Sequence, residues 1–387
     1  MTNSTLEIGS TAEKRRRISF GVALVVTGLA IYLLFAVNTQ PGALTTFGLN
    51  LLGSRAVEVS DLVVPALPAI YLLAAVAVFS GAYQMARGVR STGWLVGILA
   101  FTFVTAFLLW GARDKSFNLT GMLSSSLVRA TPIALAALCG VISERAAVIN
   151  IGVEGIMLHA FIVIRFRVDQ VVSGVAINIF GTGVTSYISS RFMQAAGDKL
   201  NNSGTFPIIA IPGLSKIPVL GPVLFENNLI VYLTILLVIV MHILLYYTPW
   251  GLRTRAVGEH PKAADTLGVN VYLMRYVNVI IGGMIAGIGG AYFTIGSVGR
   301  FDEIMTAGKG FIGLAAMIFG NWNPIGAYTS SLIFGFADSL QVKLQILRVP
   351  IPSEFLLMAP YIVTMIILTG VVGRAVPPAA DGQHYEK

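Results

Sequence analysis

A small set of polar residues inside otherwise apolar stretches offers this chain its first candidates for chemistry. Asn150 and Glu154 lie four residues apart, and therefore on one face of a helix, within a stretch broken by glycines. Residues 321–323 interrupt a second stretch, and Asp338 follows on a third. Such groups can exchange hydrogen bonds with a hydrophilic solute that leaves water to cross apolar surroundings. The predicted path residues are Asn150, Glu154, Asn321, Trp322, Asn323 and Asp338.

Each predicted path residue also has a structural interpretation. Glu154 could pair with Arg145 or cap a helix end at the membrane interface. Residues 321–323 could form a tight turn in which Asn and Pro have their usual roles, and Asp338 could hydrogen-bond between helices. Glycines at four-residue spacing in residues 282–290 indicate close packing of helices rather than function.

Motifs for bond-breaking chemistry are missing from the sequence. A phosphate-binding loop of the form GxxxxGK[ST] would need a glycine where Glu303 stands and a hydroxyl residue where Gly310 stands. The four histidines show no paired-ligand spacing, and the single cysteine, Cys139, excludes a thiolate metal site and an internal disulfide. We therefore expect no enzyme, no ATP hydrolysis and no bound cofactor or metal in this chain.

The composition predicts the elements that must position these residues. Of the 387 residues, 55% are hydrophobic and only 11% are charged, with a mean hydropathy of +0.79. A soluble domain does not tolerate such a composition, so we predict an all-α polytopic membrane protein with eight to eleven membrane segments. Seven apolar runs approach the roughly 20 residues that cross a bilayer, at 19–37, 62–83, 94–110, 171–188, 229–247, 277–298 and 355–372. Four shorter or interrupted runs could be full crossings or broken helices, at 130–142, 148–164, 311–320 and 325–340.

Basic residues orient the predicted segments. A cluster of four, residues 14–17, precedes the first run, and an excess of Lys and Arg marks the cytoplasmic side of a membrane. This arrangement requires that residues 148–164 do not complete a crossing. The resulting divisions are a cytoplasmic tail at 1–17, a transmembrane domain at 18–375 with an external loop at 189–228 and a cytoplasmic loop at 248–276, and a disordered cytoplasmic tail at 376–387. The net charge of +8 belongs to this pattern, and no nucleic-acid-binding stripe is present.

The cytoplasmic loop is polar and basic between two strongly apolar spans. It carries Arg253, Arg255, Lys262 and Arg275 against two acidic residues. A short helix is predicted to begin near Pro261 and to stop at a glycine, with two adjacent alanines that would let another surface approach closely. The loop therefore predicts a contact surface for a cytoplasmic partner, and an ordinary loop between helices is the alternative.

Four blocks of sequence resemble the permease subunits of bacterial ABC importers for nucleosides and simple sugars. They are CGVISERAAVINIGVEGIML, RFRVDQVVSGVAINI, GLRTRAVGEHPKAADTLGV and GLAAMIFGNWNPIGA, and the resemblance covers roughly residues 124–374. Within this family the chain looks most similar to the longer permease of nucleoside importers, which has an N-terminal extension. The resemblance implies a bacterial inner-membrane location and four kinds of partner, which are a cytoplasmic ATPase that uses ATP, a second permease, an extracytoplasmic solute-binding lipoprotein and membrane lipid.

The resemblance also assigns a role to the cytoplasmic loop, which would dock on the ATPase. The residues that would carry this contact are Arg253, Glu259, Lys262, Ala263, Ala264 and Gly268. Lys262 departs from the family pattern, in which an acidic residue stands before the alanines.

The chain departs from the family pattern in a second place as well. The first two blocks are joined almost directly at Leu158, where the family has a helix that crosses and returns, so about one helical hairpin is missing. Four functions remain open at this point. They are a nucleoside permease, a sugar permease, a secondary transporter driven by an ion gradient and a subunit that no longer transports.

Overall fold

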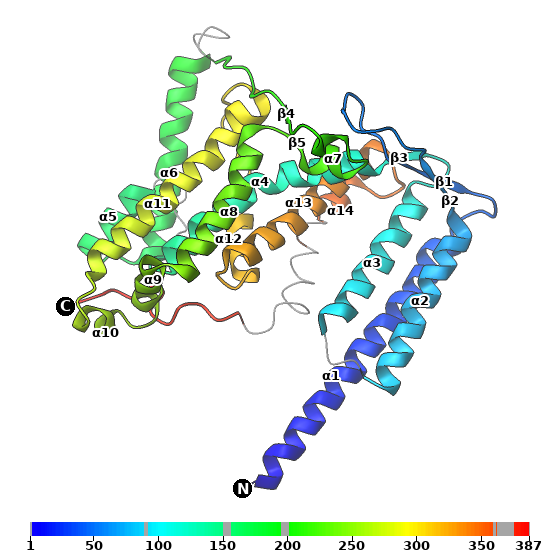
Figure 1. Ribbon diagram of the computed structural model, residues 1–387, viewed down its shortest axis with the longest axis horizontal. Helices are drawn as coiled ribbons and strands as arrows, with labels where there is room; N and C mark the ends of the chain where they lie inside the picture. Colours follow the sequence, from blue (N-terminus) through cyan, green and yellow to red (C-terminus); the bar gives the residue numbers. More distant parts are fainter. Residues whose placement is uncertain are drawn as a thin grey trace.

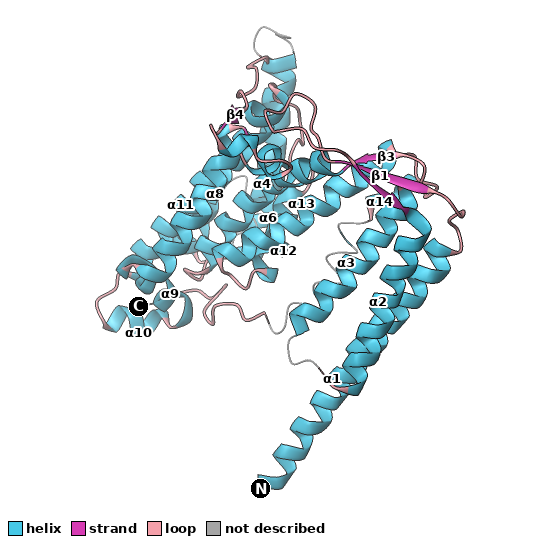
Figure 2. Ribbon diagram, turned by 45° about the vertical axis from the view of Figure 1, so that its right-hand side comes forward, coloured by secondary structure: helices cyan, strands magenta, loops and turns pink. Residues whose placement is uncertain are grey.

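The computed structural model describes residues 2–88, 92–149, 156–194, 201–358, 361 and 375–386. Within these residues, seven helices are long and apolar enough to cross a membrane. They confirm the predicted all-α membrane fold and six of the seven predicted runs, while the run at 355–372 lies largely outside the described residues. Figure 1 shows the helices as a bundle with a separate N-terminal group, and Figure 2 shows that the strands gather at one end.

The N-terminal group consists of α1 (Thr2–Ile31), η1 (Tyr32–Ala36), α2 (Ala66–Ala86) and α3 (Thr92–Gly111). Two glycines let α1 and α2 touch, because a Cβ on Gly81 would lie 2.6 Å from the carbonyl oxygen of Gly21. The group joins the bundle at the end of α3, where Leu108 and Leu109 share an apolar cluster with Leu340.

A small sheet at this junction was not predicted. It contains β1 (Leu44–Gly48), β2 (Leu62–Pro65) and β3 (Ser116–Asn118) in the order β2-β1-β3, with β1 antiparallel to β2 and parallel to β3. The hydroxyl of Thr45 donates to the Leu109 carbonyl at 2.9 Å and ties the sheet to α3. These strands are three to five residues long, too short for a periodic sequence signal.

The centre of the bundle is α4 (Leu119–Glu144), which is buried along most of its length. It packs against α11 (Val271–Ala291), which continues into η5 (Tyr292–Val298), against α12 (Lys309–Phe319) and against α13 (Pro324–Ile346). Each partner presents a glycine to α4, namely Gly282, Gly313 and Gly335. Because glycine has no Cβ, three helices can approach the backbone of one.

The glycine prediction for α11 holds on one face of the helix. Gly282 and Gly289 face α4, whereas a Cβ on Gly287 or Gly290 would meet no atom within 4 Å. The second pair therefore does not serve close packing in this chain, and the corresponding face of α11 is open.

The described ends of the region after α4 lie close together. Here α5 (Ile156–Phe166) has 11 residues, which span about 16 Å against the roughly 30 Å of a bilayer core, and α6 (Gln170–Ile188) follows at once. The amide of Ile149 donates to the side chain of Gln170 at 2.7 Å, so the chain enters and leaves this region at one point. This geometry agrees with the charge argument that residues 148–164 do not complete a crossing.

The remaining elements lie at the two ends of the bundle. At the end with the sheet are η2 (Ser189–Gln194), β4 (Ile209–Ala210), η4 (Leu214–Lys216), α7 (Leu220–Leu224), β5 (Glu226–Asn227) and α14 (Ser353–Leu357). From there α8 (Leu229–Tyr247) runs to the opposite end, where α9 (Pro249–Glu259) and α10 (Pro261–Thr266) form the predicted cytoplasmic loop.

The prediction of a disordered C-terminal tail is wrong. Residues 375–386 lie along α9, α10 and the start of α11, and Ala380 and Tyr385 are buried there. This segment carries no periodic signal because its contacts come from an extended chain with isolated apolar residues.

The packing around α4 can be tested with one substitution. A Cβ in Gly335→Ala would lie 2.4 Å from the carbonyl oxygen of Ser126, so α13 must move away from α4. We expect a loss of about 1–3 kcal/mol in stability, seen as a lower midpoint of thermal unfolding in detergent. Gly290→Ala is the matched control, since its Cβ meets open space, and equal midpoints for the two variants would contradict this description.

Candidate functional site

The polar segment at one end of the bundle is built from two short helices. The side chain of Thr248 accepts a hydrogen bond from the Gly251 amide at 3.2 Å, and Pro249 occupies the first turn, so α9 begins there. After Glu259 and His260, Pro261 starts α10 in the same way. The joint between the two helices is thus a single residue.

The end of α10 fixes the predicted glycine. Gly268 has φ +82°, its amide donates to the Asp265 carbonyl, and the Val269 amide donates to the Ala264 carbonyl at 3.0 Å. This pair of bonds is the Schellman arrangement, which needs a left-handed residue after the helix. Gly268 is also exposed, and no atom lies within 4 Å of the place its Cβ would take.

The structure separates the two predicted alanines. Ala264 is buried against Val257, Val271 and Met274, while Ala263 is exposed beside the exposed Lys262. One alanine therefore closes the inner face of α10, and the outer face is available to a partner.

Exposed leucines on this polar segment escaped the sequence analysis. Leu267, at the end of α10, is 84% exposed, and Leu252 on α9 is 62% exposed. Arg253 is exposed next to Leu252, whereas the guanidinium of Arg255 lies 5.0 Å from the ring centroid of Tyr246. Apolar side chains on a basic surface outside the membrane spans indicate a protein interface. The pattern of hydrophobic runs missed them because each leucine is isolated in the sequence.

A buried cluster connects this surface with the middle of the bundle. The indole nitrogen of Trp322 donates to Glu144 at 2.7 Å, and the Arg145 Nε atom donates to the Trp322 carbonyl at 2.9 Å. A Cβ on Gly258 of α9 would lie 2.3 Å from the Arg145 carbonyl oxygen, so α9 touches the end of α4. We name Glu144, Arg145, Trp322 and Gly258 the hub.

The hub explains where three predicted path residues lie. Asn321 and Trp322 both have φ +52°, and the side chain of Asn323 accepts from the amides of Ile325 and Gly326 at the start of α13. Their contacts are those of a tight turn between α12 and α13. Solute contact at these residues stays a prediction, and Asn150 and Glu154 lie outside the described residues.

Asp338 makes contacts between helices. Its carboxylate pairs with Arg129 of α4 at 3.0 Å and with Lys309 at the start of α12 at 3.4 Å. Asp338 and Lys309 are about four-fifths buried, so water screens this pair of bonds less than a surface pair. The interhelical role that the sequence left open is therefore present, whether or not Asp338 also contacts a solute.

A cavity of about 870 Å³ lies between α4, α6 and the open face of α11. Its lining includes Gly283, Gly287 and Gly290, together with Pro132 of α4 and Lys309 of α12. A volume of this size is within the range of small-molecule sites. Of the predicted path residues that the structure describes, none lines it, but Asp338 is joined to it through Lys309.

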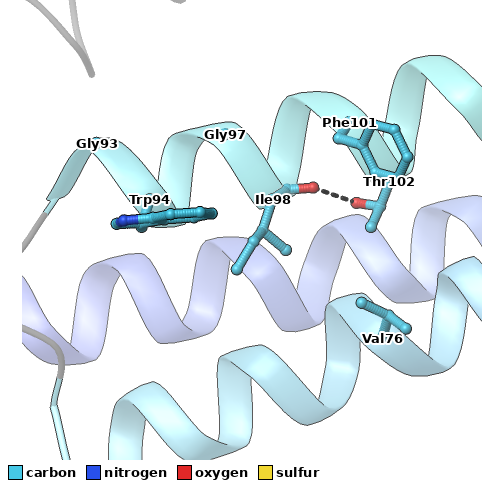
Figure 3. A pocket seen from close by; sticks show the side chains of 7 residues that line it. All are labelled: Val76, Gly93, Trp94, Gly97, Ile98, Phe101 and Thr102. Carbon is cyan, nitrogen blue, oxygen red and sulfur yellow. Dashed lines mark hydrogen bonds between the residues drawn. The ribbon is translucent and has the colours of Figure 1, made fainter.

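Two other hollows have different character. A groove of about 600 Å³ between α2 and α3 is walled by Trp94, Ile98 and Phe101, and its hydroxyl group, on Thr102, already donates to the Ile98 carbonyl at 2.8 Å (Figure 3). This groove suits apolar chains rather than a polar solute. A more polar cavity of about 510 Å³ lies at the opposite end of the bundle from α9, and the buried Asn227 lines it.

The long apolar helices among the described residues define a multi-pass membrane protein. Residues 157–372 match the family model described as Branched-chain amino acid transport system / permease component. The chain belongs to this family, and no solved structure matches it significantly.

Curated relatives indicate which kind of permease this chain is. The chain is 41% identical to the Guanosine ABC transporter permease protein NupQ of Bacillus subtilis, over 68% of this chain and 95% of the relative. It is 37% identical to the Nucleoside ABC transporter permease protein NupC of Lactococcus lactis, over 69% and 96%. It is 34% identical to the Putative glucose ABC transporter permease protein TsgC13 of Haloferax volcanii, over 58% and 78%. The chain is therefore a permease subunit of a nucleoside or sugar ABC importer, a transporter component whose class works with an ATPase and further permease chains.

The two nucleoside permeases of Lactococcus lactis match this chain over different shares of their lengths. In Lactococcus lactis, the match to NupC covers 96% of that protein, whereas the match to the nucleoside permease NupB covers 30% of it at 27% identity. Since 108 matched residues make up 30% of NupB, NupB is the longer of the two, at about 360 residues against about 320. The chain thus matches far more of NupC than of NupB.

The lengths of the matches bear on the missing hairpin. The match to NupQ runs over 309 positions, but 68% of 387 residues is only about 263, so about 46 positions of NupQ have no counterpart here. The same comparison with NupC leaves about 43 positions. Two crossing helices need roughly 40 residues, so these lengths agree with the absence of one hairpin.

The ion pairs at Asp338 give a prediction for the site. Asp338→Asn would leave Arg129 and Lys309 without their counter-charge in a partly buried position, and we expect about 1–3 kcal/mol of destabilisation and at least a tenfold loss of uptake. Thermal unfolding and solute uptake in proteoliposomes would measure both. Arg300→Gln is the control, because its pair with Asp302 is exposed and worth about 0–1 kcal/mol, and equal effects of the two substitutions would refute the role given to Asp338.

Proposed function

We propose that this permease subunit imports a nucleoside by coupling α9 and α10 to a cytoplasmic ATPase. The observation that carries the coupling site is the exposure of Leu267, which is 84% exposed at the end of α10. Only His260 separates α10 from α9, and α9 contacts the hub through Gly258. Two of the nucleoside permeases among the relatives, NupQ and NupC, are matched over at least 95% of their length and support the choice of solute.

In the proposed mechanism, the hub transmits movement of α10 to the helices around the cavity. ATP binding and hydrolysis on the partner move α10, and α9 carries the movement to the end of α4 through the contact of Gly258 with Arg145. Trp322 passes it to the turn between α12 and α13, because Glu144 and Arg145 hold both sides of that residue. Both α4 and α12 wall the cavity, so a shift at the hub changes the shape of the cavity.

The other partners follow from the same arrangement. The end of the bundle with the sheet and residues 201–228 would face outside and receive the solute-binding lipoprotein, and the clustered basic residues 14–17 would lie in the cytoplasm. A second permease would supply the other half of the pathway in the bacterial inner membrane. The match to a glucose permease of Haloferax volcanii makes a simple sugar the second candidate solute.

Uptake by the reconstituted complex tests the solute and the energy source together. Proteoliposomes with the permease and its cognate ATPase, second permease and lipoprotein should take up radiolabelled guanosine only when ATP is supplied to the ATPase side. Excess unlabelled nucleoside should compete, and glucose should not. Competition by glucose alone would favour the sugar importer, uptake without ATP would favour an ion gradient, and no uptake by a fully assembled complex would favour a subunit that no longer transports.

Gly268 offers a pair of substitutions that separates surface charge from backbone geometry. Asn and Asp have the same shape and both tolerate the left-handed conformation, but only Asp adds a negative charge to the exposed basic surface. We expect Gly268→Asp to lower ATP-driven uptake at least tenfold and Gly268→Asn to keep most of it. Normal uptake by the Asp variant would contradict a contact between this surface and the ATPase.

Leu267 tests the apolar part of the same contact. Leu267→Asp should weaken recovery of the ATPase with the tagged permease about tenfold or more, because a desolvated apolar anchor becomes charged. Leu214→Asp is the control at the opposite end of the bundle, where a partly exposed leucine is not expected to meet the ATPase. If both variants recover the ATPase equally, Leu267 is not an anchor.

A further inference from the structure

The C-terminal tail, residues 375–386, is tied to every element of the proposed coupling surface. Its main chain bonds first to α9, since the Ala380 amide donates to the Gly258 carbonyl at 2.9 Å and the Ala379 amide donates to the Glu259 carboxylate at 3.2 Å. Glu259 is the last residue of α9, immediately before the joint with α10. These bonds therefore hold the α9 side of the place where the two helices could bend.

The end of the tail packs beneath α10 and onto α11. Tyr385 is only 5% exposed and lies in one apolar cluster with Ala264 and Met274. Its ring meets Tyr272 edge to face with 5.3 Å between centroids, and the Tyr272 hydroxyl donates to the Tyr385 carbonyl at 3.2 Å. A buried aromatic residue supplies much of the contact area in a segment this short, so Tyr385 anchors the tail.

The middle of the tail reaches the hub. Asp381 hydrogen-bonds with the Glu144 carboxyl and lies near Arg275, whose Nη1 atom donates to the Gln383 carbonyl at 3.1 Å. Burial raises the pKa of Asp381 to about 6, while Glu144 and Arg275 act in the opposite direction. The same carboxyl group of Glu144 accepts a hydrogen bond from Trp322, so the tail is in contact with the hub.

Part of the tail remains open to solvent beside the docking helices. Ala379, Gln383 and His384 are exposed, and Ala379 adjoins the exposed Glu259 through its hydrogen bond. Figures 1 and 2 both place the C-terminus next to α9 and α10. The outer surface of the segment is thus continuous from the two helices onto the tail.

We propose that residues 379–386 are a working part of the ATPase-binding surface. Anchored by Tyr385, they hold α10 in one orientation and extend the surface that meets the ATPase. The proposal rests on the proposed coupling of α9 and α10 to that subunit. Without the tail, α10 would be held by the packing of Ala264 on α9 and α11 and by its chain connections, and it could bend more easily at His260, so less of the partner's movement would reach α9.

The test compares Tyr385→Ala, Tyr385→Phe and a chain that ends at Ala375. The Phe variant keeps the buried ring and the main-chain carbonyl that Tyr272 contacts and loses only the hydrogen bond of the Tyr385 hydroxyl with Asp265 of α10, so it isolates the contribution of the ring. Two quantities are measured with the protein in nanodiscs. The first is hydrogen exchange of the amides in residues 249–268 of the permease alone, and the second is binding of the cognate ATPase. We expect faster exchange and at least tenfold weaker ATPase binding in the Ala and shortened chains, with the Phe variant closer to the wild type than to the Ala variant.

Each other outcome overturns the proposal in a recognisable way. Unchanged exchange in the Ala variant would mean that the tail does not hold α10. Faster exchange with normal ATPase binding would mean that the ATPase does not use the orientation that the tail provides. If the shortened chain fails to insert, the Ala and Phe variants decide the question. If the wild-type chain recovers no ATPase, or Leu267→Asp has no effect on recovery, the proposed coupling site fails and the role of the tail fails with it.

Discussion

The close approach of three helices to the backbone of α4 is the constraint on which the rest of this structure depends. Lipid tails are as apolar as the side chains of a membrane helix, so there is no hydrophobic driving force between helices and they associate through direct packing. Glycines permit the closest contact. Gly282, Gly313 and Gly335 supply it from α11, α12 and α13. Because all three helices pack against α4, a displacement at one end of α4 is transmitted to each of them.

Polar side chains concentrate at the end of α4 that touches α9. Glu144 is only 4% exposed and receives the indole N–H of Trp322, while the Arg145 guanidinium binds main-chain carbonyls of the turn before α13. A buried carboxyl group is costly unless its hydrogen bonds are satisfied. The cost is offset here by the hydrogen bonds of the Glu144 carboxyl with Trp322 and with Asp381 of the tail. The neighbouring Arg145 carbonyl touches Gly258 of α9, so three separate parts of the chain meet at this end of α4.

Much of the fold was predictable because membrane spans leave a strong signal in any one sequence. Six long apolar runs and the basic segment between α8 and α11 could be placed from hydropathy and charge alone. The strands at 44–48 and 62–65 could not, since they are short and bond to each other across the chain. The tail could not either, because Tyr385 is a single aromatic residue in a polar segment and only its partners make it an anchor.

The site was predictable in part for similar reasons. Lys262, Ala263 and Gly268 lie on the exposed face expected of a docking helix, but Ala264 turned inward and Leu267 went unnoticed, since exposure of one residue depends on neighbours from α11 and the tail. The predicted polar residues of the path were chosen for being polar among apolar ones. In the folded chain, Asn323 caps a helix, Trp322 binds Glu144 and Asp338 neutralises two cations, so the same signal marks residues that hold helices together.

The central claim is that this chain forms a coupled importer even though about 46 positions of NupQ have no counterpart in it. The most direct measurement is the composition of the complex that a tagged chain brings with it after gentle solubilisation, determined by native mass spectrometry. The account predicts one copy of this permease together with a second permease and an ATPase. Recovery of a stably folded chain by itself would contradict it.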